Sequence, residues 1–269
     1  MLRFLILCVT YHSYSELHHY LDTVSQAAAM AGQEQWQVDV CVADNTESDC
    51  QKLTLQLPAL HEVRVFPFRE NLGYFGAVQR MMEQLPHIRD YDYVAISNVD
   101  LEMPADFFTK LRSLPLADNV GWVANAILSG LENRDRNPKI LQRYSLGRLK
   151  QLRFLFRYPL LHYLYQRTLY LRKRVYAQRP PMDIYAGHGS FILLTRSFLR
   201  HYPVLHYPVF LFGEEIYLAE LCRQAQLRVR YEPSLSIRDT EHASTGKMRK
   251  SFYYRCNYDA LNYIINTYY

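Results

Sequence analysis

The sequence predicts an α/β fold with a mostly parallel central sheet flanked by helices. Short apolar runs alternate with helical patterns throughout the first hundred residues, and the chain is long and apolar enough for a large core, with 269 residues of which 49% are hydrophobic. Strand and helix alternation is typical of parallel sheets with right-handed crossovers. The expected strands are 2–9, 37–43, 62–66 and 91–97, and the expected helices are 13–30 and 75–85.

The local signals for these elements are specific. Ser13 and Glu16 have the spacing of a capping box, which predicts the start of the first helix. Beyond residue 104 the pattern is less regular, with strands expected at 120–124, 191–194 and 227–231. A helix is expected after Gly213, because Leu218, Leu221 and Ala225 fall on one face, and a last helix is expected within 247–269.

Polar residues follow four of the expected strands: Thr10, Asp44, Asn71 and Asp100. Each alone could be a turn residue, since Asn and Asp are common in turns. In a parallel sheet, however, the carboxyl ends of the strands lie at one edge, where open α/β folds bind their ligands. The four residues together therefore predict a pocket at that edge.

Several classes of protein are disfavoured. The sequence has no GxGxxG or P-loop motif, so the usual dinucleotide and nucleoside-triphosphate sites lack their residues. Its five cysteines include no CxxC pair, which indicates reduced, structural thiols in a cytosolic setting. The apolar run at 4–9 is expected to be a strand rather than a signal peptide. No run approaches the ~20 apolar residues that span a bilayer.

The charge is distributed unevenly. Residues 136–182 contain twelve Lys or Arg and no Asp or Glu, whereas the rest of the chain has 19 basic and 26 acidic residues. The net charge of +5 therefore combines an acidic body with one strongly basic segment. This asymmetry indicates an anionic partner at that segment.

Six short motifs occur in a recognisable order: VTYHS (9–13), ADNTESD (43–49), ENLGYFGAVQ (70–79), ISNVD (96–100), GHGSFILLTR (187–196) and LFGEE (211–215). In this order they resemble family-2 glycosyltransferases of the GT-A fold, in particular the bacterial branch that includes rhamnosyltransferases. The similarity covers residues 5 to about 245 and is interrupted by the basic segment. It implies one domain over 1–269, with a nucleotide-sugar half (1–125), a basic helical insert (136–182) and an acceptor-side half (183–269).

The resemblance implies transfer of a sugar from a nucleotide diphosphate sugar to a hydroxyl, with Mg²⁺ or Mn²⁺ as cofactor. Asp100 corresponds to the carboxylate that holds the metal or the diphosphate, and Asn98 to the first position of the family's DxD or NxD motif. Hard cations prefer such oxygen ligands. Glu102 could be an additional ligand if the strand continues to it, and His242 could reach the metal.

The resemblance also implies a donor pocket and an acceptor side. Donor residues would be Thr10, Tyr11, Asp44, Asn71, Gly73 and Asn98. The catalytic base would come from Glu214 and Glu215, where the family has Glu-Asp, and Glu215 is favoured. Consecutive helical residues point about 100° apart, so only one of the two can face the acceptor. His188 and Gly189 are expected near the acceptor.

The segment 153–174 interleaves Arg and Lys with Phe, Tyr and Leu. This composition is typical of a helix that lies on an anionic membrane surface. A hairpin that packs its apolar side on the core is an alternative, and single-stranded nucleic acid, which also binds basic and aromatic residues, is the least favoured partner.

The sequence therefore predicts an inverting glycosyltransferase of bacterial surface polysaccharide synthesis (capsule, O-antigen or lipopolysaccharide). It would act on a glycan or lipid-linked acceptor at the cytoplasmic face of the membrane. A non-catalytic glycan- or nucleotide-binding protein with the same fold is the alternative, because Glu replaces Asp at the base position. A nucleotidyltransferase is less favoured, since the sequence lacks a glycine-rich, lysine-bearing loop.

Overall fold

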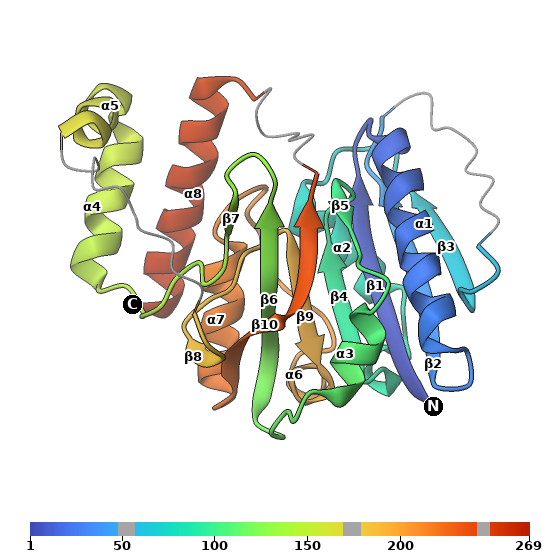
Figure 1. The fold of residues 1–269 in the computed structure, drawn as a ribbon. Coiled ribbons are helices and arrows are strands. Elements are labelled where there is room, and N and C mark those ends of the chain that lie inside the picture. Colours follow the sequence, from blue (N-terminus) through green and yellow to red (C-terminus); the bar gives the residue numbers. More distant parts are fainter. Residues whose placement is uncertain (48–56, 169–178, 241–247) are drawn as a thin grey trace.

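A computed structural model describes residues 1–47, 57–168, 179–240 and 248–269. One mixed sheet crosses the molecule in the order β3-β2-β1-β4-β9-β6-β10-β5 (Figure 1). Its strands are β1 (Leu2–Thr10), β2 (Trp36–Asp44), β3 (Glu62–Pro67), β4 (Tyr93–Ser97), β5 (Leu101–Glu102), β6 (Val120–Ser129), β9 (Phe191–Thr195) and β10 (Arg228–Asp239). The short strands β7 (Arg134–Asp135) and β8 (Met182–Ile184) pair with β6 and β10.

Helices cover both faces of the sheet (Figure 1). α1 (Tyr14–Ala31) and α3 (Phe107–Ser113) contribute to the apolar core on one face. The core on the other face is formed with α2 (Tyr74–Glu83), α6 (Arg196–His201), α7 (Glu214–Gln224) and α8 (Lys250–Tyr268). A short 3₁₀ helix, η1 (Ile88–Asp90), precedes β4.

The position of β1 in the sheet explains why its sequence is continuously apolar rather than alternating. Phe4, Ile6 and Cys8 are buried in the core beneath α1 and α3, whereas Leu5 and Leu7 are buried in the core on the opposite face. A parallel strand covered on both faces is expected to be apolar at every position.

The pairing of the strands brings the polar strand ends together. β1 pairs in parallel with β2, with Thr10 opposite Asp44, and with β4, with Cys8 opposite Ser97. β9 runs antiparallel to β4, with Phe191 opposite Ser97, so the segment before β9 lies at the edge where β4 ends. This reversal places the GHGS motif, 187–190, beside the carboxyl ends of the parallel strands.

In its described residues the basic insert contains the helices α4 (Leu146–Arg157) and α5 (Pro159–Thr168). The side chain of Ser145 caps α4 by accepting a hydrogen bond from the Arg148 backbone N–H (3.2 Å). α4 packs on α8 at the end of the molecule away from β3 (Figure 1). Within the described parts of the chain, no helix is both long and apolar enough to cross a bilayer.

The predicted fold class is confirmed, with local corrections. Ser13 precedes α1 as expected, but its hydroxyl donates to the Tyr11 carbonyl and makes no capping bond, so the capping box is wrong. β6 and β10 extend well beyond the predicted 120–124 and 227–231, because they pair with each other over almost their whole length. Tertiary pairing of this kind does not depend on local periodicity.

Candidate functional site

The first part of the site is the pair of strand ends at β1 and β2. Thr10 is fully buried, and its hydroxyl oxygen has no hydrogen-bond partner among the described residues. The neighbouring Asp44 is also buried, and its two carboxylate oxygens accept hydrogen bonds from the Tyr14 hydroxyl (2.9 Å) and the Thr46 backbone N–H (3.0 Å). A buried polar atom without a partner is costly, so the Thr10 hydroxyl is a candidate ligand contact.

The loop before α2 is connected to these strand ends by Asn45. Its side-chain amide donates to the Gly73 carbonyl (2.9 Å), while its own side-chain carbonyl oxygen is buried without a partner in the part of the chain that the structure describes. The Asn71 side chain in turn accepts a bond from the Gly73 N–H (3.1 Å). Gly73 has φ +74°, and a Cβ there would lie 2.2 Å from the Phe210 carbonyl oxygen, so glycine is required whether or not a donor approaches it.

Tyr11 lies at the outer side of this group. Its ring is partly exposed, and its hydroxyl donates to Glu47 (3.2 Å). An exposed aromatic ring beside a buried polar pocket is suited to stacking on a nucleotide base. Thr10, Tyr11, Asp44, Asn71 and Gly73 are thus brought to one edge of the sheet, as the sequence predicts.

Asp100 follows β4 at this edge. Partial burial raises the pKa of its carboxyl, while a backbone hydrogen bond, a hydrogen bond from Asn98 and the charge of Arg136 act in the opposite direction. The Thr240 backbone N–H and hydroxyl both donate to the Asp100 carbonyl (3.1 and 2.9 Å). Asn98 and Asp100 are therefore neighbours on a turn that is held to the end of β10.

One conditional expectation about a metal ligand is not met here, and another is not tested. β4 ends at Ser97, so the strand alternation that would align Glu102 with Asp100 does not occur. Glu102 lies on β5 and forms an ion pair with Arg238 (3.8 Å), which makes it a poor candidate ligand. His242 lies outside the described residues.

The chemistry of these residues fits a hard divalent cation. Asp100 supplies a carboxylate and Asn98 an amide oxygen, and Mg²⁺ typically uses one or two carboxylates plus the phosphates of its substrate. No group of three or more His, Cys, Asp or Glu that could hold a metal occurs among the described residues. The arrangement therefore fits a cation bound together with a diphosphate rather than a cation held by protein alone.

The two glutamates at the start of α7 have different environments. Glu214 is buried, its Oε1 accepts a hydrogen bond from the Phe212 N–H (2.9 Å), and burial together with the charge of Glu215 raises its pKa to about 8. Glu215 is only half-buried, and a Cβ placed on Gly189 would lie 3.1 Å from its Oε1. Glu214 thus stabilises the turn before α7, whereas Glu215 faces the GHGS motif.

That motif connects Glu215 to Asp100. Gly189 contacts Glu215, and the next residue, Ser190, accepts a hydrogen bond from the Asn98 N–H through its carbonyl (2.9 Å). Tyr74 supports the same turn, because its hydroxyl donates to the Gly189 carbonyl (3.1 Å). Burial, followed by the charges of Glu214, Asp100 and Glu215 among others, raises the pKa of Tyr74, so the tyrosine stays neutral between the carboxylates.

His188 is neutral at physiological pH. Its Nδ1 accepts from the Ser190 N–H (3.2 Å), and burial and the charges of Lys139, Arg136 and Arg134 lower its pKa to about 3. Its own backbone N–H donates to the Asn137 side chain (2.8 Å). A position of His188 near the acceptor stays a prediction, and the structure adds a group of cations around it that the sequence prediction did not include.

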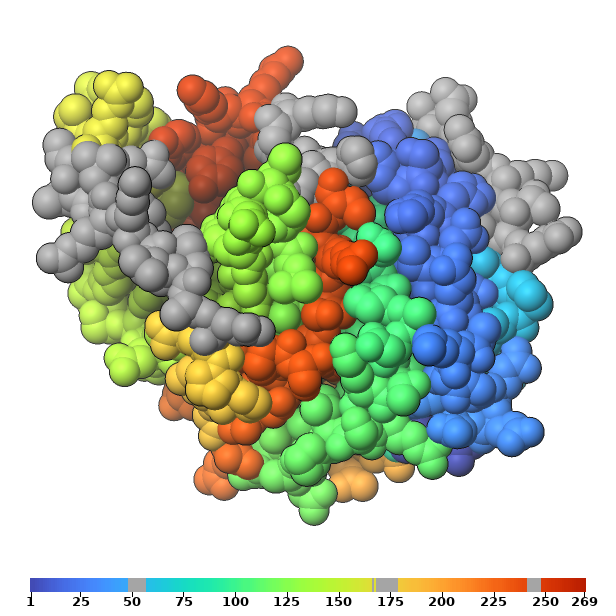
Figure 2. Space-filling view, in the orientation of Figure 1, coloured from blue at the N-terminus to red at the C-terminus, as the bar shows by residue number. Residues whose placement is uncertain are grey.

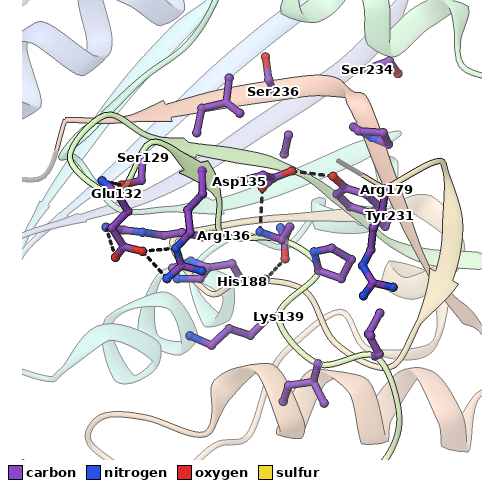
Figure 3. A pocket seen from close by; sticks show the side chains of 18 of the residues that line it. Ser129, Glu132, Asp135, Arg136, Lys139, Arg179, His188, Tyr231, Ser234 and Ser236 are labelled. Atoms are coloured by element: carbon purple, nitrogen blue, oxygen red, sulfur yellow. Dashed lines mark hydrogen bonds and ion pairs between the residues drawn. The ribbon is translucent and has the colours of Figure 1, made fainter. Parts of the chain in front are cut away.

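An open cleft of about 1990 Å³ continues from His188 (Figure 3). It is lined mainly by residues 126–145, with contributions from Arg179, His188 and β10. In Figure 2, β6, β7 and the turn between them (light green) lie beside β10 (orange) on the surface. The cleft thus extends from the GHGS motif to the start of α4, where Ser145 is a lining residue.

Sequence reasoning missed Asn45, Tyr74, Arg136 and Lys139. Asn45 and Tyr74 are part of the ADNTESD and ENLGYFGAVQ motifs, so closer attention to those motifs could have found them. Arg136 and Lys139 begin the basic segment 136–182, for which the prediction named an anionic partner but assigned only 153–174 to a membrane surface. Only the tertiary pairing of β6 with β10 and β9 places them beside the site.

Comparison with known proteins identifies the architecture. No protein-family model and no curated protein matches the sequence. Among solved structures, a mannosyltransferase from Pyrobaculum calidifontis, in complex with GDP-Man and Mn²⁺, aligns with a TM-score of 0.52 and 14% identity, over 90% of this chain and 59% of that chain. S. aureus TarS gives 0.56 and 11% identity, over 91% of this chain and 37% of that one.

A third structure, GalNAc-T7 with UDP, GalNAc and Mn²⁺, gives a TM-score of 0.59 and 12% identity over 98% of this chain and 48% of that one. The chain therefore spans between 37% and 59% of the length of these three proteins. Identities this low establish the fold alone. The chain has the α/β fold of these glycosyltransferases, which is the architecture that its motif order predicts.

Proposed function

We propose that the protein is a glycosyltransferase that moves a sugar from a nucleotide diphosphate sugar to an acceptor hydroxyl. One observation carries the proposal: the GHGS turn contacts Glu215 through Gly189 and holds the backbone of Asn98 through Ser190. The carboxylate suited to a base and the carboxylate suited to a metal therefore flank a single turn. Transfer of a sugar needs both functions at adjacent positions.

The donor nucleotide would bind at the ends of β1 and β2. The buried oxygens of Thr10 and Asn45 that lack partners would be satisfied by the base or ribose, and the Tyr11 ring would stack on the base. Asp44 already accepts from Tyr14 and Thr46, so it would contribute by fixing this pocket and by sharing a further hydrogen bond.

Asp100, with Asn98, would hold Mg²⁺ or Mn²⁺ against the donor diphosphate. When bound, the cation would act as a Lewis acid that offsets the negative charge developing on the leaving diphosphate. Asp100 is suited to this role because its partly buried carboxylate is oriented by Asn98 and is not neutralised by a close ion pair in the described residues.

Glu215 would accept the proton of the acceptor hydroxyl. A general base must reach its substrate, and Glu215 is half-buried beside Gly189 whereas Glu214 is buried and hydrogen-bonded to Phe212. The N-terminus of α7 favours the ionised form of a carboxylate. A base that acts directly on the acceptor supports an inverting reaction.

The surface of α4 and α5 supports a membrane-bound acceptor in surface polysaccharide synthesis. Large apolar side chains are exposed there, with Leu160 at 72% and Phe154 at 53%, and others nearby on the same two helices. Arg153, Arg157 and Arg167 belong to the same helices. An exposed apolar face beside cations is complementary to a bilayer that contains anionic lipid.

Sedimentation with vesicles tests the membrane contact. We expect the protein to bind vesicles that contain phosphatidylglycerol and to lose this binding in a variant with Phe154→Ser, Leu160→Ser and Leu164→Ser. These side chains are exposed, so the fold should be retained. Equal binding by the variant, at low and moderate salt, would contradict membrane docking through this surface.

A nucleotide screen tests the proposed activity. The thermal stability of the protein would be measured with UDP, dTDP, GDP and CMP, with and without Mn²⁺, because a bound ligand raises the stability of the folded state. We expect one nucleotide to stabilise the protein in a manner that depends on Mn²⁺, and the matching sugar nucleotide to be hydrolysed slowly. Stabilisation without hydrolysis or transfer would favour a non-catalytic binding protein.

A further inference from the structure

The cleft beside His188 has an excess of positive charge. Its lining includes the cations Lys110, Arg134, Arg136, Lys139, Arg143 and Arg179, against the carboxylates Glu132 and Asp135 (Figure 3). The Asp135 carboxylate is already hydrogen-bonded within the protein. It accepts hydrogen bonds from the Tyr231 hydroxyl (2.6 Å), from the Ile127 N–H (2.8 Å) and from the Asn137 N–H (2.7 Å).

Four of the six cations already have a carboxylate partner. Lys110 pairs with Asp106, Arg134 with Glu132, Arg136 with Glu132 and Asp239, and Arg143 with Glu220. Lys139 and Arg179 differ, because neither forms a hydrogen bond or ion pair with any of the described residues. They are both exposed to solvent and both line the cleft.

Lys139 lines the same cleft as His188 of the GHGS turn. Its charge lowers the pKa of His188 and that of Glu214, which belong to the GHGS turn and to the start of α7. Lys139 thus lines the cleft together with His188, which belongs to the turn that contacts Glu215 through Gly189. An anion bound at Lys139 would therefore be near the acceptor hydroxyl rather than at the donor edge formed by β1 and β2.

We propose that Lys139 and Arg179 form a binding subsite for a phosphate group on the acceptor, so that the enzyme selects a phosphorylated sugar. Arg presents a planar fork of N–H donors and Lys a compact charge, and both bind phosphate oxygens through charge-assisted hydrogen bonds. This inference rests on the proposed function for the identity of the ligand as acceptor. The cleft leads to the start of α4, so a phosphate that links the sugar to a lipid could reach the membrane surface.

Binding of a small probe tests the subsite without requiring turnover. Glucose 1-phosphate, methyl glucoside and glucuronate would be titrated calorimetrically into the protein, in the presence of Mn²⁺ and the nucleotide that stabilises it most. We expect glucose 1-phosphate to bind most tightly, and Lys139→Ala with Arg179→Ala to weaken it at least about tenfold, which is the expected order for the loss of charge-assisted contacts. Equal binding of glucuronate, or unchanged binding by the double variant, would overturn the proposal.

A matched control removes the same amount of charge elsewhere. Arg89 and Arg200 are exposed, lie outside the cleft lining and form no ion pair with any residue that the structure describes, so Arg89→Ala with Arg200→Ala should leave the affinity unchanged. Lys139→Arg with Arg179→Lys keeps both charges and should retain most of the binding. An equal loss in the control would mean that net charge alone attracts the probe, which contradicts a local subsite.

A second comparison distinguishes a phosphate on the acceptor from the phosphate of a lipid headgroup. A short-chain prenyl phosphate in neutral phosphatidylcholine vesicles presents the same group on a lipid. If the cleft binds the acceptor phosphate, the double variant weakens binding both to this lipid and to glucose 1-phosphate. Loss of vesicle binding alone would assign the cations to lipid headgroups and overturn the subsite.

The same experiments distinguish the two proposals. If no nucleotide stabilises the protein but glucose 1-phosphate still binds through Lys139 and Arg179, the proposed donor chemistry fails and the phosphate subsite stands. If nucleotide binding and hydrolysis are retained while the double variant leaves phosphate binding unchanged, the subsite fails and the glycosyltransferase proposal stands.

Discussion

Glu215 lies directly against Gly189, so closely that a Cβ on residue 189 would be 3.1 Å from its carboxylate Oε1. The contact joins the start of α7 to the turn before β9, two segments that are separated by 25 residues or more in sequence. Because the Tyr74 hydroxyl also binds the Gly189 carbonyl, the position of this turn is fixed from two sides. The contact therefore determines where the proposed base points.

The first prediction follows from that contact. Gly189→Ala should displace the Glu215 carboxylate and lower kcat about 10–100-fold, since small misplacements of a catalytic group have effects of this order. The melting temperature should change little, because the displaced atoms belong to a half-buried side chain. The measurement is sugar transfer or donor hydrolysis, together with thermal unfolding.

Gly130→Ala is the matched control, because a Cβ on Gly130 would have no atom within 4 Å. It should keep the activity of the unmodified protein. If Gly189→Ala is equally active, Glu215 is not held by this turn in the working enzyme.

The second prediction concerns Glu214 and pH. Burial and the charge of Glu215 raise the pKa of Glu214 to about 8, above its usual value, so the folded state holds a proton that the unfolded state releases. This contribution to stability is fully present below the usual pKa of a glutamate and is lost as the pH rises to about 8. Glu214→Gln keeps the acceptor for the Phe212 N–H without titrating, so its stability should fall less over this interval.

Urea unfolding at pH 5, 6, 7 and 8 measures the difference in free energy of unfolding between the two proteins. Glu215→Gln is the control, because it removes the neighbouring charge but leaves Glu214 buried. In this variant the free energy of unfolding should still fall as the pH rises, but by less than in the original protein. Parallel curves for the original protein and Glu214→Gln would show that Glu214 is not protonated in the folded state.

Some residues of the site could be placed from the sequence, and others could not. The edge formed by Thr10, Asp44 and Asp100 follows from strand order, because the carboxyl ends of parallel strands must meet. The resemblance supplied the pair Glu214 and Glu215, and helix geometry indicated only that one of them can face the acceptor. The preference for Glu215 stays a prediction, and the hydrogen bond from the Phe212 N–H to Glu214 is an observation that only the structure could supply. Glu102 could join Asp100 only if the strand continued past Ser97, and β4 ends there, at the boundary that the sequence predicts. The role of Lys139 depends on long-range pairing, which short patterns do not encode.

The third prediction tests Asp100 through metal binding. Asp100→Asn keeps the shape of the side chain but removes the charge, so the Mn²⁺ concentration that gives half of the nucleotide-dependent stabilisation should rise at least about tenfold, as expected when a hard cation loses an anionic ligand. Thermal shift at a fixed nucleotide concentration provides the measurement. Asp106→Asn, whose carboxylate is exposed and paired with Lys110, should leave the Mn²⁺ dependence unchanged. An unaltered dependence in Asp100→Asn would remove Asp100 from the metal site.

The last prediction concerns a buried carboxylate that joins the basic insert to α7. Glu220 is 0% exposed and accepts hydrogen bonds from Arg143 (2.6 Å), Tyr185 (2.6 Å) and Arg223 (2.8 Å). Burial alone would raise the pKa of Glu220, but these three donors hold it below its usual value. Stability from this group is therefore present above the usual pKa of a glutamate and is lost as the pH falls through the lower folded-state value.

Glu220→Ala should lower the free energy of unfolding by about 1–3 kcal/mol, because the Tyr185 hydroxyl loses its acceptor, while Arg143 and Arg223, whose side chains are 35% and 52% exposed, can bind water instead. Asp106→Ala breaks an exposed pair with Lys110 (2.8 Å) and should cost about 0.5 kcal/mol or less. Urea unfolding at pH 7 measures both. Arg143 also stacks on the Tyr269 ring (3.8 Å to its centroid), so the loss should loosen the start of the insert and the end of α8 together. Equal costs for the two variants would mean that water also replaces Glu220 as the partner of Tyr185, and that the insert is anchored by its apolar contacts with α8 alone.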